Sequence, residues 1–263
     1  MGYPGGKNGA GVYQTIINLM PPHRVYIEPF LGGGAILRLK RPAAVTVGLD
    51  LDPAVISQWR SPLAGPAAQQ HKSAVIEAGE VDCLKACTGT YDDKGLPWFL
   101  FSRECGIDFL RRLSRTQPGP ETLIYCDPPY VLSSRKQGRE IYNFEMTDQQ
   151  HAELIDILKS PGMKARVLLS GYWSTMYGRM LRRWNCAPFQ TSTRGGTPAT
   201  EYVWFNFPAP VELHDYRFLG ADYRERERIK RKKTRLVKRL ERMPLLERQA
   251  LLSAIAETSG VAR

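Results

Sequence analysis

The chain has 263 residues, enough for one domain with a full hydrophobic core, and its 37 Lys and Arg against 26 Asp and Glu give a net charge of +11. Such an excess favours polyanionic partners and says nothing about the fold. No run of 18 apolar residues and no charged-then-apolar leader occurs, which argues against a membrane span and a signal peptide. The five scattered cysteines fit a reducing cytoplasm better than a disulfide framework.

The first sixty residues alternate between helical and strand patterns. The expected elements are a helix over Ala10–Met20, a strand over Val25–Ile27, a glycine loop over Glu28–Gly34, a helix over Ala35–Lys40, a strand over Val45–Leu49 that ends at Asp50, and a helix over Pro53–Trp59. This order of strand, glycine loop, helix, strand and acid is typical of the start of a nucleotide-type α/β sheet.

Beyond residue 60 the pattern changes, and Pro and Gly interrupt helix-like pieces over Ala67–Ala78 and Pro97–Leu113. We therefore expect an insertion over 61–113. The sheet pattern then returns with a strand over Thr122–Cys126, a helix from the capping box of Thr147 and Gln150 to about Lys159, a strand over Arg166–Ser170, a helix over Ser174–Arg183, and an edge hairpin of Cys186–Ser192 and Glu201–Phe207.

The carboxyl-terminal tail is strongly basic. Between Arg217 and Arg242 it holds twelve Lys and Arg against four Asp and Glu, a net charge of +8. A thin apolar seam on this charged helix is formed by Ile229, Leu236, Leu240 and Met243, and Pro244 starts a second helix. The tail is equally well interpreted as a phosphate-binding helix and as a solvated or oligomerising one.

These patterns predict an α/β fold with a Rossmann-like sheet and helices on both faces. Residues 1–60 and 114–215 would form the main domain, 61–113 a small, mainly helical insertion, and 216–263 a basic helical extension.

The strand Thr122–Cys126 ends in Asp127-Pro128-Pro129-Tyr130. The prolines fix φ and turn the backbone carbonyls outward. Asp127 and the Pro128 carbonyl could then accept both protons of a nucleobase amine, and Tyr130 offers a ring on which the base can stack. A tight surface turn is the alternative interpretation, since Asp-Pro pairs commonly open turns.

Gly32 and Gly34 would let the backbone approach a ligand closely, and Asp50 at the end of the next strand could bind a ribose diol. A dinucleotide dehydrogenase would use similar parts, but the third glycine of its fingerprint falls on Leu37. A glycine turn that only packs a helix on a strand is the structural alternative.

Together these residues resemble the Dam-type DNA adenine methyltransferases. Five stretches carry the resemblance. Tyr3-Pro4-Gly5-Gly6-Lys7 is similar to the family's amino-terminal motif, Glu28–Gly34 to its donor loop, and Asp50 to its ribose-binding acid. Asp127–Tyr130 is similar to its catalytic motif, and Tyr142–Thr147 to the return from its mobile loop. Further similarity at Ser170–Tyr172 and Thr200–Trp204 extends the match to about Phe207 and leaves the basic tail outside it.

The resemblance implies an enzyme that transfers a methyl group from S-adenosylmethionine to N6 of an adenine flipped out of double-stranded DNA, leaving S-adenosylhomocysteine and needing no metal. The catalytic residues it implies are Asp127, Pro128, Pro129 and Tyr130. The donor contacts it implies are Tyr3, Lys7, Glu28, Phe30, Gly32, Gly34, Asp50 and Asp127. The DNA contacts expected from the basic loop and the tail are Arg135, Lys136, Arg139, Arg231, Lys232 and Lys233.

The resemblance also implies a cytoplasmic, bacterial or phage-encoded protein, as in restriction-modification systems, acting as a monomer or as a weak dimer through its last helices. The expected target-recognition region is short, because only 76 residues separate Asp50 from Asp127. The recognition sequence therefore stays open. Methylation of cytosine N4, methylation of adenine in RNA, and nucleic-acid binding without catalysis remain alternative functions.

Overall fold

The computed structural model describes residues 6–60, 75–77, 83–88, 97–135, 142–192 and 197–258. The chain divides after Tyr216 into two compact units, a sheet domain and a tail. This division falls one residue from the boundary that the charge pattern suggests.

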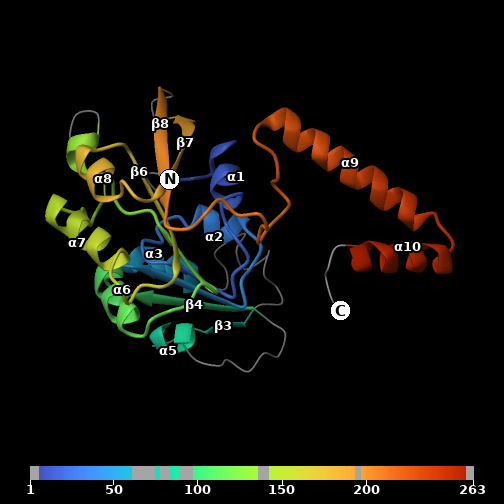
Figure 1. Cartoon of the computed structure of the whole chain (residues 1–263). Helices are drawn as coiled ribbons and strands as arrows, with labels where there is room; N and C mark the ends of the chain where they lie inside the picture. Colours follow the sequence, from blue (N-terminus) through green and yellow to red (C-terminus); the bar gives the residue numbers. More distant parts are fainter. Residues whose placement is uncertain are drawn as a thin grey trace. The chain divides into compact units, whose positions relative to one another are not determined.

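The described part of the sheet domain holds one sheet of eight strands in the order β3-β4-β2-β1-β5-β6-β8-β7 (Figure 1). The strands are β1 Val25–Glu28, β2 Val45–Asp50, β3 Val75–Glu77, β4 Trp98–Arg103, β5 Thr122–Cys126, β6 Arg166–Gly171, β7 Asn185–Ser192 and β8 Pro198–Phe205. Strands β1 to β6 run parallel to one another, whereas β8 is antiparallel to both β6 and β7. The expected edge hairpin is confirmed, with its turn at 193–196 outside the described residues.

Strand β1 lies between β2 and β5, so the winding of the sheet reverses at β1. In open α/β sheets, ligands bind at such a switch point, outside the carboxyl ends of the strands. The topology therefore directs attention to the residues that follow β1, β2 and β5.

Helices cover both faces of the sheet, which confirms the predicted α/β Rossmann-like architecture. They are α1 Val12–Ile17, α2 Ala35–Leu39, α3 Pro53–Arg60, α5 Cys83–Thr88, α6 Gly106–Arg115, α7 Asp148–Leu158 and α8 Thr175–Met180, with a short 3₁₀ turn at Leu132–Ser134. Helices α5, α6, α7 and α8 pack side by side, and α1 packs with α2. Alternate residues of the central strands form one core with α6 and α7: Val25, Ile27, Val45, Val47, Ile124, Cys126, Phe109, Leu110, Leu154 and Leu158.

The start of α7 follows directly from its sequence. The Gln150 backbone N–H donates to the Thr147 hydroxyl at 3.2 Å, and the Gln150 side chain accepts from the Thr147 backbone N–H at 2.8 Å. This reciprocal pair is the predicted capping box, and it satisfies N–H groups that have no partner inside the helix.

Two helical predictions are wrong in part. Val75–Glu77 and Trp98–Arg103 are the strands β3 and β4, and β4 lies between β3 and β2. The middle of β4 is buried, so its apolar run lacks the alternation that marks a strand with one solvent-facing side. Part of 61–113 thus belongs to the sheet, residues 61–74 lie outside the described residues, and target recognition by this region stays a prediction.

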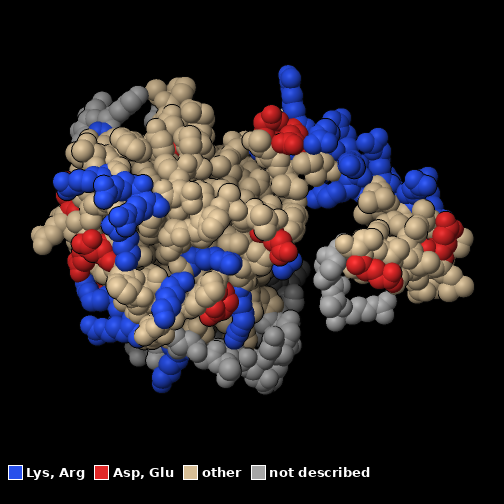
Figure 2. All heavy atoms as spheres, in the orientation of Figure 1, with Lys and Arg blue, Asp and Glu red and all other residues tan. Residues whose placement is uncertain are grey.

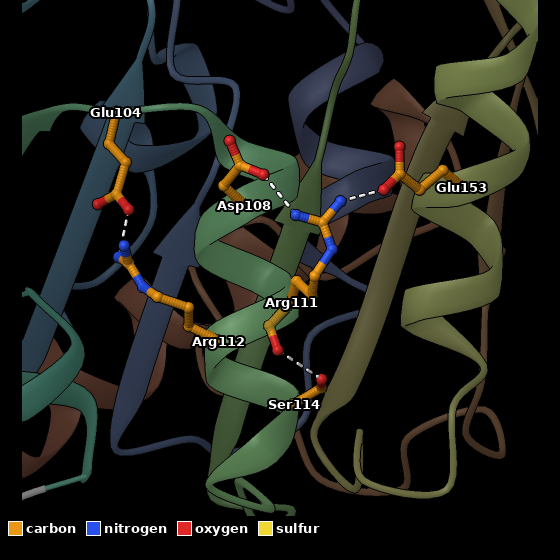
Figure 3. A network of polar contacts seen from close by, with 6 residues as sticks. All are labelled: Glu104, Asp108, Arg111, Arg112, Ser114 and Glu153. Carbon is orange, nitrogen blue, oxygen red and sulfur yellow. Dashed lines mark hydrogen bonds and ion pairs between the residues drawn. The ribbon is translucent and has the colours of Figure 1, made fainter.

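Polar contacts join α6 to its neighbours (Figure 3). Arg112 pairs with Glu104, which follows β4, while Arg111 pairs with Asp108 and with Glu153 of α7. The side chains are mostly well exposed, and exposed ion pairs contribute about 0–1 kcal/mol each. The buried face of α6, and not this network, therefore holds the helix in place.

The tail consists of α9, Tyr223–Glu241, and α10, Leu245–Thr258, with no buried residue in either helix. Asp222 caps α9 by accepting the Glu225 backbone N–H at 2.8 Å. Lys and Arg side chains cover α9 (Figure 2). Among the described residues, no helix combines the length and the apolar character that crossing a bilayer requires.

Candidate active site

The carboxyl ends of β1, β2 and β5 bring three predicted site acids to one edge of the sheet. Glu28 ends β1, Asp50 ends β2, and Asp127 follows β5. All three line a single cavity of about 340 Å³ together with the glycine loop and Lys7. That volume lies in the range of small-molecule sites.

The glycine loop owes its shape to two residues with positive φ, Gly32 at 44° and Gly34 at 54°. Only glycine adopts this region without strain. A Cβ on Gly34 would also lie 2.2 Å from Cζ2 of Trp59, whose indole N–H donates to the Gly32 carbonyl at 3.2 Å. Trp59 of α3 therefore packs directly on the loop and fixes the floor of the cavity.

Asp50 holds the same loop from the other side. One carboxylate oxygen accepts the Gly32 backbone N–H at 2.8 Å, and the other accepts the Asp52 backbone N–H at 2.9 Å. Burial raises the pKa of Asp50, and these backbone donors oppose that rise. Since each carboxylate oxygen can accept more than one hydrogen bond, Asp50 keeps acceptor capacity for a diol in the cavity.

Glu28 lies deeper, with the Tyr26 hydroxyl donating to it at 2.6 Å. Burial raises the pKa of Glu28 to about 8, although the Tyr26 bond favours the ionised form. A cationic ligand nearby would restore the charge of this carboxyl.

The predicted catalytic carboxylate belongs to a buried network of four side chains. The Lys7 ammonium lies 2.9 Å from Asp127 Oδ2 and 3.4 Å from Glu201 Oε2. It also donates to the Tyr130 hydroxyl at 2.6 Å, and that hydroxyl donates to Glu201 at 2.6 Å. Burial alone would lower the pKa of Lys7, but the two carboxylates raise it above its ordinary value.

The hydrogen bonding of the Asp127 carboxylate is incomplete. Its Oδ1 atom is buried and has no hydrogen-bond partner among the described residues. Burial raises the pKa of Asp127, Lys7 opposes this rise, and Glu201 adds to it. A buried acceptor without a partner costs free energy, so a hydrogen-bond donor on a ligand that reached this oxygen would be stabilised there.

The rest of the Asp-Pro-Pro-Tyr motif lies around this carboxylate. Pro129 lines the cavity, Pro128 is buried, and Tyr130 lies beside the cavity, with its ring 4.8 Å from that of Tyr172 in an edge-to-face arrangement. The motif thus brings two aromatic rings close to the carboxylate that lines the cavity.

The segment after the basic loop closes one wall of the cavity, which Tyr142, Asn143 and Glu145 line. The Asn143 amide donates to Asp52 at 2.9 Å, and the Tyr142 backbone N–H donates to Glu145 at 3.0 Å. This segment therefore connects the wall to β2 and leads into the capped start of α7.

Arg135 does not take the solvent-facing position expected of a DNA contact. It donates twice to the Glu145 carboxylate, at 2.8 and 2.6 Å, and its side chain is only 7% exposed. A bidentate pair of this kind is geometrically specific, so Arg135 supports the cavity wall in this conformation. Contact with phosphate would require the pair to open.

The other predicted site residues fall into three groups according to their position. Phe30, Gly32, Gly34 and Lys7 line the cavity as expected. Tyr3, Lys136 and Arg139 lie outside the described residues. Arg231, Lys232 and Lys233 are exposed on α9.

The sequence reasoning assigned no role to Glu201, Tyr172 or Asn143. All three lie in stretches that carry the family resemblance, so a signal was present. Glu201 reaches the site because β8 is antiparallel to β6, pairing Tyr202 with Gly171 and placing Glu201 at the carboxyl end of β6. No spacing rule in the sequence reveals that pairing. Among the described residues, no cluster of three His, Cys, Asp or Glu could hold a metal ion.

No protein-family model matches this chain, and no curated protein matches it. Among solved structures, magnesium protoporphyrin IX methyltransferase from Synechocystis PCC 6803 with bound S-adenosylmethionine is 15% identical and covers 74% of this chain and 76% of its own, with a TM-score of 0.37. An S-adenosylmethionine-dependent methyltransferase from Agrobacterium tumefaciens is 14% identical and covers 74% of this chain and 59% of its own, with a TM-score of 0.40. A putative methyltransferase from Escherichia coli is 16% identical and covers 70% of this chain and 76% of its own, with a TM-score of 0.33. Likenesses this weak leave the function to be inferred from the site itself.

Substituting Gly34 tests the packing of the glycine loop. Gly34→Ala should lower the free energy of unfolding by about 2–4 kcal/mol, because a side chain at positive φ adds to the clash with Trp59. Gly11→Ala is the matched control, since Gly11 also has positive φ but a Cβ added there would meet no atom within 4 Å, and should cost about 1–2 kcal/mol. Equal losses in urea denaturation would show that Trp59 does not press on the loop.

Proposed function

We propose that this protein transfers a methyl group from S-adenosylmethionine to the exocyclic N6 of adenine in double-stranded DNA. The observation that carries the proposal is the position of Asp127, which lines the same cavity as the glycine loop and whose buried Oδ1 atom has no hydrogen-bond partner among the described residues. The motifs that resemble the Dam-type family lead us to expect this reaction, and the cavity shared by Asp127 and the glycine loop supports it.

The residues around the cavity fit the proposed donor. Gly32 and Gly34 allow close approach, Asp50 can accept from a ribose diol, and the carboxyls of Glu28 and Asp127 favour a cation. S-adenosylmethionine supplies a methyl group on a positively charged sulfur, so no metal is required.

Asp127 would hold the adenine amine through its unsatisfied oxygen, with the Pro128 carbonyl as the second acceptor. Two acceptors localise the nitrogen lone pair, which is otherwise delocalised into the ring, and they stabilise the positive charge that grows on nitrogen as the N–C bond forms. The amine proton becomes acidic only at that stage, so Asp127 acts first as an acceptor and need not be a strong base.

Lys7 favours the ionised form of Asp127, and Glu201 positions Lys7 together with Tyr130. A buried ammonium between two carboxylates is stable only if all its partners are in place, so the network fixes the direction of the Asp127 carboxylate. Tyr130 is thereby held with its ring beside the reacting amine.

Adenine must leave the duplex to reach this cavity, at a cost of a few kcal/mol. Stacking on an aromatic ring returns about 1–3 kcal/mol. The two terms nearly cancel, so phosphate contacts must supply the affinity.

Incubating the protein with tritiated donor and unmethylated genomic DNA, followed by sequencing for modified adenines, tests the proposal directly. Base analysis separates N6-methyladenine from N4-methylcytosine, and a matched RNA tests the other polymer. DNA that binds but gains no label would favour a non-catalytic binding module, although the intact Asp127 and Tyr130 argue against that function.

Asp127→Ala should reduce methyl transfer by about 10²-fold or more, because it removes an acceptor aimed at the developing charge. The fold should be retained, and unfolding curves check this. Asp108→Ala, on the exposed network of α6, is the control and should leave transfer unchanged. Near-normal tritium incorporation by the Asp127 variant would refute the catalytic assignment.

Glu201→Gln should move both limbs of the pH profile of kcat/KM to lower pH. Glu201 raises the pKa of both Asp127 and Lys7, so removing its charge lowers both values. Asp127 then ionises at lower pH, which shifts the acidic limb, and Lys7 loses its proton at lower pH, which shifts the alkaline limb.

Glu153→Gln provides the control, because Glu153 pairs with Arg111 (Figure 3) and does not line the cavity. A purely structural role for Glu201 would reduce the rate at every pH without moving the limbs.

The tail should contribute salt-dependent affinity. If six of its basic residues contact phosphates, affinity for DNA should fall roughly 10³-fold between 50 and 200 mM salt. Truncation after Phe218 should remove most of that slope. The same slope in the truncated protein would make α9 and α10 a solvated or oligomerising unit.

A further inference from the structure

Strand β6 ends at Gly171, and the next two residues, Tyr172 and Trp173, continue along the edge that carries the candidate site. All five tryptophans lie among the described residues, and only Trp173 is exposed, at 55%. Single exposed apolar side chains are common, so the indole is of interest for its surroundings and not for its exposure alone.

The indole of Trp173 is held firmly on one side. A Cβ on Gly178 of α8 would lie 2.7 Å from Cζ2 of Trp173, so the ring occupies space that any other side chain at 178 would fill. Its centroid lies 5.4 Å from that of Tyr202 and 6.1 Å from that of Trp204. The ring is therefore fixed by a helix and a strand while more than half of its surface stays open.

Trp173 is linked to the Asp-Pro-Pro-Tyr motif through its neighbour in the chain. The ring of the preceding residue, Tyr172, packs edge-to-face on that of Tyr130. A nucleotide whose base enters the site beside Tyr130 would therefore have its covalently linked neighbours close to Trp173.

The surface beside Trp173 is basic. Arg179, Arg182 and Arg183 are exposed, and none of them forms an ion pair with another described residue. Arg179 lies in α8 next to Gly178, and Arg182 and Arg183 follow in the turn after the helix. Figure 2 shows Lys and Arg side chains gathered on the part of the molecule that carries α8. A second copy of this chain would bring the same positive charge, whereas a polyanion complements it.

We propose that Trp173 is a stacking platform for a base adjacent to the target, with Arg179, Arg182 and Arg183 on the neighbouring phosphates. The proposal rests on the proposed function for the identity of the polymer. It gives the sheet domain a DNA-binding surface of its own, independent of the basic tail. Aromatic stacking accepts any base, so this surface contributes affinity and position with little sequence preference.

The test uses the full chain and two fluorescent duplexes that carry one unpaired adenine, with ordinary or with abasic nucleotides on both sides of it. Trp173→Ala should weaken binding of the first duplex about 5- to 100-fold in fluorescence anisotropy, the range expected for one stacked base. Trp173→Phe should restore most of the affinity. On the abasic duplex, the Ala variant and the wild type should bind alike.

Trp98→Phe is the control, since Trp98 begins β4 at the opposite end of the strands and should leave binding unchanged. Arg182→Ala should reduce the salt slope by about 0.9, the value for one phosphate contact.

Two results would overturn the inference: wild-type affinity in Trp173→Ala, or an equal loss on both duplexes, which would indicate a structural role. If the wild-type protein binds DNA without methylating it, the proposed reaction is refuted while the stacking surface can still be supported. If the protein methylates DNA and Trp173→Ala has no effect on binding, the stacking surface is refuted and the proposed reaction is retained.

Discussion

A buried lysine is the constraint on which the candidate site depends. The Lys7 side chain is only 5% exposed, and an ammonium taken from water costs several kcal/mol unless its partners repay the loss. Its partners come from the loop after β5 and from β8, so the amino-terminal segment, the Asp-Pro-Pro-Tyr motif and the edge hairpin must meet for Lys7 to be stable. The direction of Asp127 is thus determined by the fold of the whole domain.

The cavity joins two chemical environments at one strand end. On the side of β1 and β2, the glycine loop, Trp59 and Asp50 form a rigid, hydrogen-bonded floor suited to a small polar ligand. On the side of β6 and β8, Tyr130 and Tyr172 present aromatic edges and faces suited to a planar base. Asp127 belongs to both environments, because it lines the cavity and shares Lys7 with Tyr130.

Positive charge is distributed unevenly along the chain. The acidic cavity keeps Lys7 and Arg135 in internal ion pairs, whereas Arg179 of α8 and most of the arginines of α9 are exposed. Internal cations orient carboxylates, and exposed ones attract phosphates from a distance set by the ionic strength. The net charge of the chain therefore combines two roles that only burial separates.

The sequence by itself determined the elements with local signals. The glycine loop, the acid after β2, the Asp-Pro-Pro-Tyr turn after β5 and the capping box of Thr147 depend on a few neighbouring residues, and the structure places each as expected. Only the tertiary structure decided that Trp98–Arg103 is a strand, that Glu201 completes the network of Lys7, and that Arg135 turns inward to Glu145. Those outcomes depend on which distant segments pair and on which side chains their packing buries. Burial changes the free energy of a charged side chain by more than the conformational preferences of neighbouring residues do.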